Sequence, residues 1–401
     1  MTTLAAARRT SVRTDAAGAV VVGGDYQGLG IARSLGRAGV PVVVLDDEVS
    51  ISRVSRYVDR FVRVADLLDP DATMAALRGL VPSLAGQRWV LFPTREETVA
   101  VVARHREELS RHFRVPTPGF EVVRTAWDKR ETYRCAAELG IPVPRCWFPR
   151  SEDDLQAVDL SAPVVVKPAI KEHFIYETKV KAWRADTSQE LRTMYRRALE
   201  VVPPDEVIVQ EMVPGDGSSQ LAYCALFKDG RALGEMTVRR LRQHPSDFGR
   251  ASTYVETVDL PELAELSGRL LERMGYYGLV EVEFKRDQRD GSPKLLDVNA
   301  RTWGYHSLGA AAGVDFPVML YADQLGYDVP AARARTGVRW IRLETDLPNA
   351  CRDMWRGRLR LRDYLRTLRG VDTEAVFSWR DPWPGLFEAA LTPYLAVRRG
   401  L

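Results

Sequence analysis

The chain has 401 residues, of which 45% are hydrophobic and 28% are charged, and its net charge is +3. These values are ordinary for a soluble globular protein with two or three domains. The small net charge does not indicate a nucleic-acid partner, and no apolar run reaches the ~20 residues that span a bilayer.

Residues 1–17 are polar and arginine-bearing, without the apolar core of a secretory signal, so we expect a disordered lead-in. The four cysteines form no CxxC pair and the five histidines form no HxxxH pair. These spacings indicate neither a zinc site nor a disulfide framework. A reducing cytoplasm is therefore the expected location.

An α/β pattern follows over residues 18–122. Residues 18–24 predict a buried strand, 27–37 a helix and 40–45 a second strand, which together form a βαβ unit. The nearby glycines do not fit the GxGxxG spacing of a dinucleotide site. We therefore expect a Rossmann-like domain, and a NAD(P)-binding oxidoreductase stays open only as a weaker alternative.

Lysine is scarce, since only eight of the 57 basic residues are lysine. A lysine presents a compact ammonium on a flexible stem, so its retention can mark an anion site. Lys129 begins a predicted helix, and Lys167 ends the apolar strand 164–166. Lys179 and Lys181 alternate with apolar residues, which predicts a strand for this segment.

Two further segments carry polar groups. The strand 207–212 runs into a turn at Pro214 and Gly215. The strands 221–227 and 231–237 flank a Lys-Asp-Gly turn and predict a hairpin. Its outer strand leads to a basic stretch that begins at Arg239. That stretch could bind an anionic substrate, although a solvated arginine face is the commoner explanation.

The segment 279–304 predicts another hairpin, because apolar and polar residues alternate on both sides of an Asp-Gly turn. Glu281, Glu283 and Lys285 share one face of its first strand. With the turn near Asp290, Glu283 lies opposite Asp297. This face offers hard oxygen ligands suited to Mg²⁺. A solvated hairpin face with ordinary charges is the alternative.

These residues resemble the metal-binding end of the ATP-grasp superfamily, in which an acid on one strand precedes acid-x-Asn-x-Arg on the next. Glu283 matches the first acid and residues 297–301 match the second run. The resemblance covers roughly residues 18–328. It implies an α/β and α+β chain with a Rossmann-like pre-ATP-grasp domain at 18–122 and a two-lobed ATP-grasp domain at 123–330. Beyond the resemblance we expect a helical C-terminal extension at 331–401.

The resemblance also implies roles for individual residues. Metal ligands would be Glu283, Asp297 and Asn299, and Arg301 with Lys167 would act in catalysis. The glycine-rich flap of many family members is absent here, so side chains would hold the nucleotide. The implied nucleotide-binding residues are Lys129, Lys167, Lys171, His173, Lys181, Gln210, Glu211, Met212, Val213 and Asp216. The implied substrate-binding residues are Arg239, Arg301, Trp303, Tyr305 and His306.

The expected function is that of a carboxylate–amine ligase, which uses ATP and Mg²⁺, with Mn²⁺ as a substitute, to form an acyl phosphate and then an amide. Its partners would be a small carboxylate and a small amine. An ATP-grasp phosphotransferase would share every ATP-binding residue and stop at phosphate transfer. A non-catalytic nucleotide sensor is a further alternative, against which the complete acid–acid–amide set argues.

Residues 331–401 lie outside the resemblance and hold 14 arginines, no lysine and eight acids, with tryptophans at 340, 355, 379 and 383. Arginine interleaved with tryptophan is typical of an interfacial helix at an anionic membrane. Packing onto the main body or onto a homodimer partner is the favoured interpretation, with peripheral membrane contact as the second.

Overall fold

The computed structural model describes residues 17–84, 86–215, 217–244 and 251–399, so nearly all of the predicted lead-in lies outside it. The chain divides into two compact units. One contains the residues up to 117 together with 317–329 and 376–391, and the other contains 118–316, 330–375 and the residues from 392 onward. The predicted boundaries treated the chain as consecutive pieces. The return of two late segments to the first unit depends on long-range packing, which local patterns do not show.

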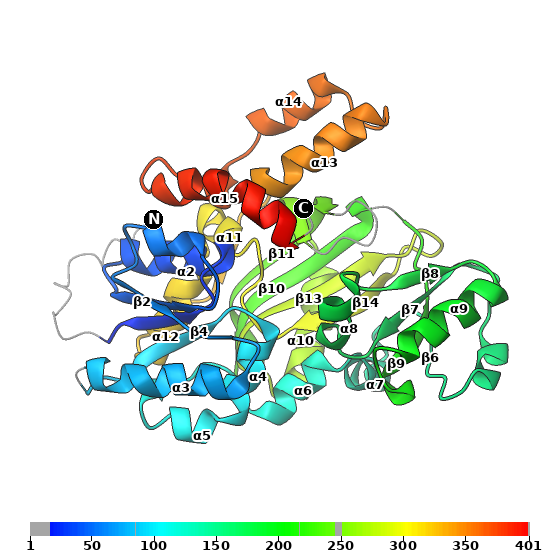
Figure 1. Cartoon of the computed structure of the whole chain (residues 1–401), viewed down its shortest axis with the longest axis horizontal. Coiled ribbons are helices and arrows are strands. Elements are labelled where there is room, and N and C mark those ends of the chain that lie inside the picture. Colours follow the sequence, from blue (N-terminus) through cyan, green and yellow to red (C-terminus); the bar gives the residue numbers. More distant parts are fainter. Residues whose placement is uncertain (1–16, 85, 216, 245–250, 400–401) are drawn as a thin grey trace. The chain divides into compact units, whose positions relative to one another are not determined.

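The first unit is built on a parallel sheet with the strand order β3-β2-β1-β4-β5 (Figure 1). Its central strands are short, valine-rich and fully buried, as expected for a sheet covered on both faces. The strands are β1 (Ala19–Val22), β2 (Val42–Asp46), β3 (Arg60–Arg63), β4 (Trp89–Pro93) and β5 (Phe113–Arg114). The helices are α2 (Tyr26–Arg37), α3 (Pro70–Leu80), α4 (Glu96–Arg104), α5 (Arg106–Leu109) and most of α12 (Phe316–Gln324).

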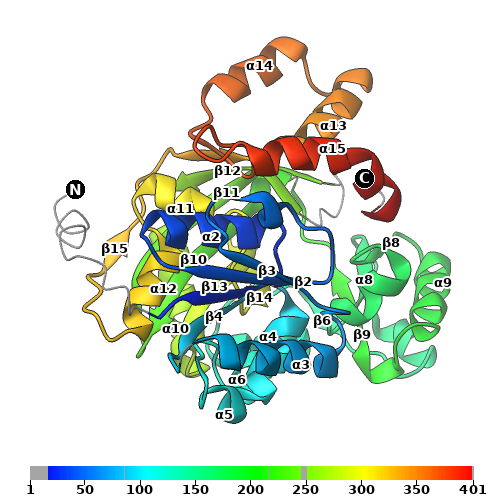
Figure 2. The same cartoon turned by 60° about the vertical axis from the view of Figure 1, so that its left-hand side comes forward.

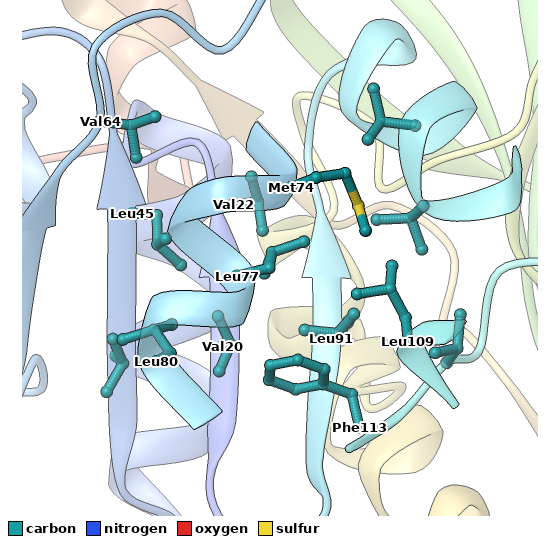
Figure 3. Close-up of a cluster of buried hydrophobic side chains, with 14 of the residues drawn as sticks. Val20, Val22, Leu45, Val64, Met74, Leu77, Leu80, Leu91, Leu109 and Phe113 are labelled. Carbon is teal, nitrogen blue, oxygen red and sulfur yellow. The ribbon is translucent and has the colours of Figure 1, made fainter. Parts of the chain in front are cut away.

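One hydrophobic core lies between this sheet and α3 (Figure 3). Leu77 and Leu80 from α3 point toward Val20 and Val22 of β1 and toward Leu91 of β4. These side chains are at most 2% exposed. Burying a side chain of this kind contributes roughly 1.5–3 kcal/mol, so the cluster stabilises the whole α/β unit.

The glycines after β1 have a packing role in this unit. Gly23 has a φ of +101°, and a Cβ at Gly28 would stand 2.1 Å from the carbonyl oxygen of Gly23. The close approach of α2 to the end of β1 therefore requires glycine at position 28. This packing explains the glycine, and a pyrophosphate-binding role is not needed to account for it.

A buried ion pair holds the segment 376–391 to the rest of the first unit. Arg33 Nε on α2 lies 2.9 Å from Asp381 Oδ2. The same carboxylate accepts hydrogen bonds from the Ser55 hydroxyl and from the Arg56 backbone N–H. Asp381 is 0% exposed and fully hydrogen-bonded, which is the arrangement that a buried charge requires. Helix α15 (Trp383–Arg399) begins directly after it.

The second unit contains a four-stranded sheet with the order β6-β9-β7-β8, shown in green in Figure 1. A cluster of buried apolar side chains fixes α9 against this sheet. The strands are β6 (Cys146–Trp147), β7 (Val164–Pro168), β8 (Trp183–Ala185) and β9 (Val207–Glu211). The helices that precede or accompany them are α6 (Phe120–Trp127), α7 (Lys129–Glu138), α8 (Glu172–Thr178) and α9 (Ser188–Leu199).

The segment that holds Lys179 and Lys181 is not the predicted strand. Helix α8 occupies residues 172–178 and ends at Lys179, whose φ of +61° is left-handed. Strand β8 begins only at Trp183. Two lysines separated by one residue match a strand period over too few positions to exclude a helix end.

The same unit contains an eight-stranded sheet, β14-β13-β10-β11-β12-β16-β17, in which β15 pairs with β11 (Figure 2). The two predicted hairpins are confirmed, as β10–β11 and β13–β14. The strands are β10 (Gln220–Lys228), β11 (Arg231–His244), β12 (Ala251–Val258), β13 (Gly278–Arg286), β14 (Pro293–Asn299), β15 (Ala332–Arg333), β16 (Arg339–Ile341) and β17 (Thr373–Glu374). The helices are α10 (Pro261–Arg273), α11 (Ser307–Ala312), α13 (Leu343–Trp355) and α14 (Leu361–Arg369).

The inner face of α13 is tied to this sheet by a second buried ion pair. The Arg242 guanidinium on β11 donates two hydrogen bonds of 2.8 Å to Asp346, which is 0% exposed. Thr253 on β12 donates to the same carboxylate. Helix α13 is thus an integral part of the second unit. Among the described residues, no helix is long and apolar enough to cross a membrane.

Candidate active site

A cavity of about 920 Å³ opens within the second unit. Strands of both sheets line it, with the first turn of α7 and the end of α13. Ten of the predicted site residues are in its wall: Lys129, Lys167, Lys171, Lys181, Gln210, Glu211, Met212, Val213, Glu283 and Asp297. Most of the predicted nucleotide-binding set thus meets at one place.

The acidic side of the cavity is built on the β13–β14 hairpin. Glu283 pairs with Asp297 across the strands, as the predicted register requires, and Glu281 pairs with Asn299. Asn299 Nδ2 donates to Glu283 Oε1 at 2.8 Å and to Glu281 Oε2 at 3.0 Å. The amide therefore leaves its oxygen directed away from both glutamates.

Two lysines from distant segments neutralise the end of β14. Lys129 Nζ lies 2.9 Å from Asp297 Oδ1. Lys171 Nζ lies 2.7 Å from Asn299 Oδ1 and 3.7 Å from Asp297 Oδ2. Burial acts to raise the pKa of Asp297, but the two ammonium groups outweigh it and hold that pKa well below its usual range. Lys129 is only 7% exposed, so it is not an ordinary solvated first-turn lysine.

Glu283 has its own cationic neighbours. Arg240 on β11 lies 3.3 Å from Glu283 Oε2, and Lys181 also acts on this carboxylate. Burial acts to raise the pKa of Glu283, but Arg240 and Lys181 hold it below its usual value. Burial lowers the pKa of Lys181 to about 8. Both acids of the hairpin are therefore ionised and paired near neutral pH.

Lys167 occupies a more enclosed position at the end of β7. Its Nζ donates to Gln210 Oε1 at 2.6 Å and to the Tyr133 hydroxyl at 3.1 Å. Burial and the neighbouring Lys129 ammonium lower the pKa of Lys167 to about 8. No carboxylate is among its hydrogen-bond partners in the described residues, so an anionic ligand would supply the charge that Lys167 lacks.

The end of β9 forms another part of the wall. Glu211 is 6% exposed and lies between two arginines, 3.3 Å from Arg145 Nε and 3.2 Å from Arg289 NH2. The Met212 backbone N–H donates to the Pro163 carbonyl. Asp216, the other acid predicted here, lies outside the described residues.

Glu281 was not among the predicted site residues. It is 4% exposed, bonded to the Tyr305 hydroxyl and to Asn299, and thus supports the residue that bridges both glutamates. Burial and the neighbouring Glu283 raise the pKa of Glu281 to about 7. The signal was present in the sequence, because Glu281 shares a strand face with Glu283 and lies opposite Asn299.

The structure places the predicted substrate arginine, Arg239, outside the cavity wall and its neighbour Arg240 in it. Arg239 is bonded to Glu256 at 3.0 Å on the neighbouring strand and is not in the cavity wall. Arg240 lines the cavity and contacts Glu283 instead. Successive side chains alternate between the faces of a strand, so the choice of neighbour decides the environment.

The predicted aromatic substrate pocket is core. Trp303 is 0% exposed and packs edge-to-face on Phe316, with ring centroids 4.8 Å apart. Tyr305 is directed at Glu281, and His306 is 1% exposed. Burial lowers the pKa of His306 to about 4, so its ring is neutral. None of the three is in the cavity wall, and all three are buried.

Three other predicted residues also lie outside the cavity wall, among them Asn299, which is 1% exposed. His173 on α8 is exposed, and its Nδ1 lies 2.8 Å from Glu206. Arg301 is half-buried, with NH2 3.4 Å from Asn299 Oδ1. Arg301 thus stays within reach of the acidic hairpin, whereas His173 is committed to a surface ion pair.

The hairpin fits a hard divalent cation by its chemistry. Carboxylate and amide oxygens are the donors that Mg²⁺ prefers, usually one or two carboxylates completed by phosphates and water. Glu283, Asp297 and the Asn299 amide supply this set. Among the described residues there is no group of three or more His, Cys, Asp or Glu side chains that would hold a metal alone. The donor set therefore suits a cation that arrives with a phosphate ligand.

Comparison with known proteins gives the family. A family model described as ATP-grasp in the biosynthetic pathway with Ter operon matches residues 205–345, which include β9–β14. Residues 205–345 therefore match an ATP-grasp family domain. The predicted ATP-grasp enzyme related to carboxylate–amine ligases is confirmed at this level.

A sequence relative and two solved structures agree with this assignment. D-aspartate ligase of Enterococcus faecium (strain Aus0004) is 25% identical over 298 residues, which are 70% of each chain. L-amino acid ligase from Bacillus licheniformis has a TM-score of 0.60 at 16% identity and covers 81% of this chain and 78% of its own. The biotin carboxylase domain dimer of Hydrogenobacter thermophilus 2-oxoglutarate carboxylase, solved with MgADP, ADP and bicarbonate, has a TM-score of 0.64 at 14% identity and covers 80% and 73%. The two structures show a shared mixed α/β ATP-grasp fold.

Proposed function

We propose that the chain is an ATP- and Mg²⁺-dependent ligase that joins a carboxylate to an amine through an acyl phosphate. One observation carries the proposal. Lys129 and Lys171, from separate segments, both contact the Asp297–Asn299 end of the acidic hairpin, and both lysines line one cavity with Asp297. Ammonium groups facing paired acids are the charges that a metal–triphosphate needs on its two sides.

The phosphates would lie among Lys129, Lys167, Lys171 and Lys181. In the present structure Lys129 and Lys171 are paired with the hairpin, whereas Lys167 donates only to neutral groups. Triphosphate oxygens would give each ammonium an anionic partner. The purine and ribose would lie along Gln210–Val213, where Glu211 is already fixed by two arginines. Asp216 remains a proposed ribose ligand.

Glu283, Asp297 and Asn299 would hold Mg²⁺, and Mn²⁺ would use the same oxygen donors. When bound, the cation would neutralise part of the triphosphate charge. The chain's part is to keep the donors ionised and aligned, since Arg240 and Lys181 hold the pKa of Glu283 below its usual value. Glu281 would keep the Asn299 amide in place through its hydrogen bond.

The proposed reaction has two steps. A carboxylate oxygen of the substrate attacks the γ-phosphorus, the bond to the β–γ bridging oxygen breaks, and ADP leaves. The amine nitrogen then attacks the acyl carbon, loses its proton to solvent, and releases phosphate. Lys167, Arg240 and Arg301 would offset negative charge during the first step. Proximity of the two anions would supply much of the acceleration.

An amino acid is the substrate class that the relatives support, because the two ligases are named for D-aspartate and for L-amino acids. Under the same proposal the first unit is the Rossmann-like pre-ATP-grasp domain, and residues 331–401 form a helical extension. The proposed location is the cytoplasm. A homodimer is a further proposal, for which the biotin carboxylase domain dimer gives a precedent in the fold.

The deciding experiment measures the ADP that the full chain forms from ATP. Amino acids and amino sugars are offered as substrates, singly and in pairs. A ligase requires a carboxylate, and hydroxylamine converts the acyl phosphate to a hydroxamate. ADP release that needs only an alcohol would establish the phosphotransferase instead. If the chain binds ATP but forms no ADP with any pair of substrates, it would be a non-catalytic nucleotide sensor.

A further inference from the structure

We propose that the end of α13, the turn that follows it and α14 form a docking surface for an anionic lipid bilayer. The surface comprises residues 352–369 of the second unit. It lies outside the region matched by the family model, which ends at residue 345. The inference is independent of the ligase proposal.

Large apolar side chains are exposed on this surface. Trp355 is 86% exposed, Leu361 59% and Leu365 47%. Leu361 and Leu365 are one turn apart and share a face of α14. Single exposed apolar residues are ordinary, but a gathering of large ones marks an interaction site.

The same surface is strongly basic. Residues 352–369 contain seven arginines and two aspartates, which gives a net charge of +5. Two arginines pair with the aspartates. The other five are exposed, and their side chains make no ion pair or hydrogen bond with the described part of the chain: Arg352, Arg356, Arg360, Arg362 and Arg369. These five arginines therefore have no acidic partner in the described part of the chain.

Helix α14 is fixed to the second unit through its buried side, so its exposed side is available for binding. Tyr364 is 2% exposed, and the Arg242 guanidinium lies 5.3 Å from its ring centroid. Arg242 is fixed in turn by Asp346. Both views show α14 at the outer edge of its unit (Figures 1 and 2). The buried Tyr364 anchors α14, whereas Leu361, Leu365 and the arginines of the helix are exposed.

An anionic bilayer satisfies both properties of this surface. Tryptophan and arginine are favoured at the level of the lipid headgroups, where leucine can enter the acyl boundary. A second copy of the chain would bring the same uncompensated positive charge. An acidic protein would pair with the arginines but would not need the leucines.

The test uses the full chain and sedimentation with vesicles of phosphatidylcholine, with and without phosphatidylglycerol. We expect binding to the anionic vesicles only, weakening with added salt. Arg362→Gln with Arg369→Gln should lower the partition coefficient about 25-fold, because each basic residue near an anionic leaflet contributes roughly fivefold. Leu361→Gln with Leu365→Gln should abolish binding. The matched control is Arg37→Gln with Arg192→Gln, two exposed arginines elsewhere, which should bind like the wild type.

Circular dichroism of each variant checks that the fold is retained. Absence of wild-type binding to anionic vesicles, or an equal loss in the control variant, would overturn the proposal. Undiminished vesicle binding by the double-leucine variant would show that the arginines alone bind the vesicles. That result would also overturn the proposal. Analytical ultracentrifugation measures the oligomeric state of the wild type and of the double-leucine variant. A dimer that forms only in the wild type would show that this surface binds a second copy of the chain, and would overturn the proposal.

Discussion

Lys129 Nζ lies 2.9 Å from Asp297 Oδ1, although 168 residues separate the two in the chain. Lys129→Met would remove the ammonium from the cavity and leave Asp297 with Lys171 alone. We expect ADP formation to fall by a factor of about 10²–10³, the usual effect of losing one preorganised charge. Lys228→Met, on the distant β10–β11 turn, is the control and should stay active. A steady-state ADP assay makes the comparison, and full activity of Lys129→Met would contradict the proposed phosphate site.

Asp297→Ala and Asn299→Ala should each abolish ADP formation while the fold survives. Both remove a proposed oxygen donor from the hairpin. The matched control is Asp290→Asn on the exposed turn of the same hairpin, which should be active. Circular dichroism confirms the fold. The metal site would be refuted by full activity in both alanine variants.

Arg239 and Arg240 form a natural pair for testing the cavity, since they are adjacent on β11 and differ in partner. Arg240→Gln would remove the cation beside Glu283, and we expect kcat/KM to fall by about 10²-fold. Arg239→Gln should change kcat/KM little, because its partner Glu256 keeps Arg339 at 2.9 Å. An equal loss in both variants would show that the strand, and not the cavity, is affected.

Burial and the Lys129 ammonium lower the pKa of Lys167 to about 8, so the group loses its charge within a measurable range. We expect kcat/KM for ATP to decline as the pH rises above about 8. In Lys167→Arg the guanidinium stays charged, so the decline due to this residue should disappear. A shared decline in wild type and variant would assign it to another group, such as Lys181.

Glu281 should give the folded state a pH-dependent stability. Burial raises the pKa of Glu281 from 4.5 to about 7, so the folded protein binds this proton more tightly than the unfolded chain. The contribution is complete below about pH 4.5 and is lost as the pH rises through about 7, by about 3 kcal/mol. Glu281→Gln should flatten this decline in the free energy of unfolding. Urea unfolding across that range measures it, and an unchanged slope would exclude Glu281 as its source.

Asp381→Ala would leave Arg33 buried without its carboxylate partner. We expect a loss of about 3–5 kcal/mol in the free energy of unfolding, as for other broken buried pairs. Glu108→Ala breaks the exposed pair with Arg78 and should leave that free energy nearly unchanged. Equal stability of the two variants would show that the Asp381 contacts do not hold the C-terminal segment.

The hairpins were predictable because period-two alternation and Asp-Gly turns are local signals, and they fixed the pairing of Glu283 with Asp297. Arg240 was missed because β11 shows arginine at 239, 240 and 242, so its alternation gives no preferred face. Irregular pairing near Arg240 and Arg242 weakens the pattern further. Residues 303–306 follow the family run directly, yet their burial depends on the packing of Phe316, which no local pattern indicates.

The Asp381 contacts also bear on how the protein is made. The ribosome synthesises residues 17–117 well before the segment that completes their unit, 376–391. Until that segment is synthesised, Arg33 and Ser55 lack their hydrogen-bond partner, the Asp381 carboxylate. Domains generally fold as units during synthesis, and exposed intermediates are prone to aggregate. Residues 17–117 are therefore exposed without their complete native contacts until residues 376–391 have been synthesised.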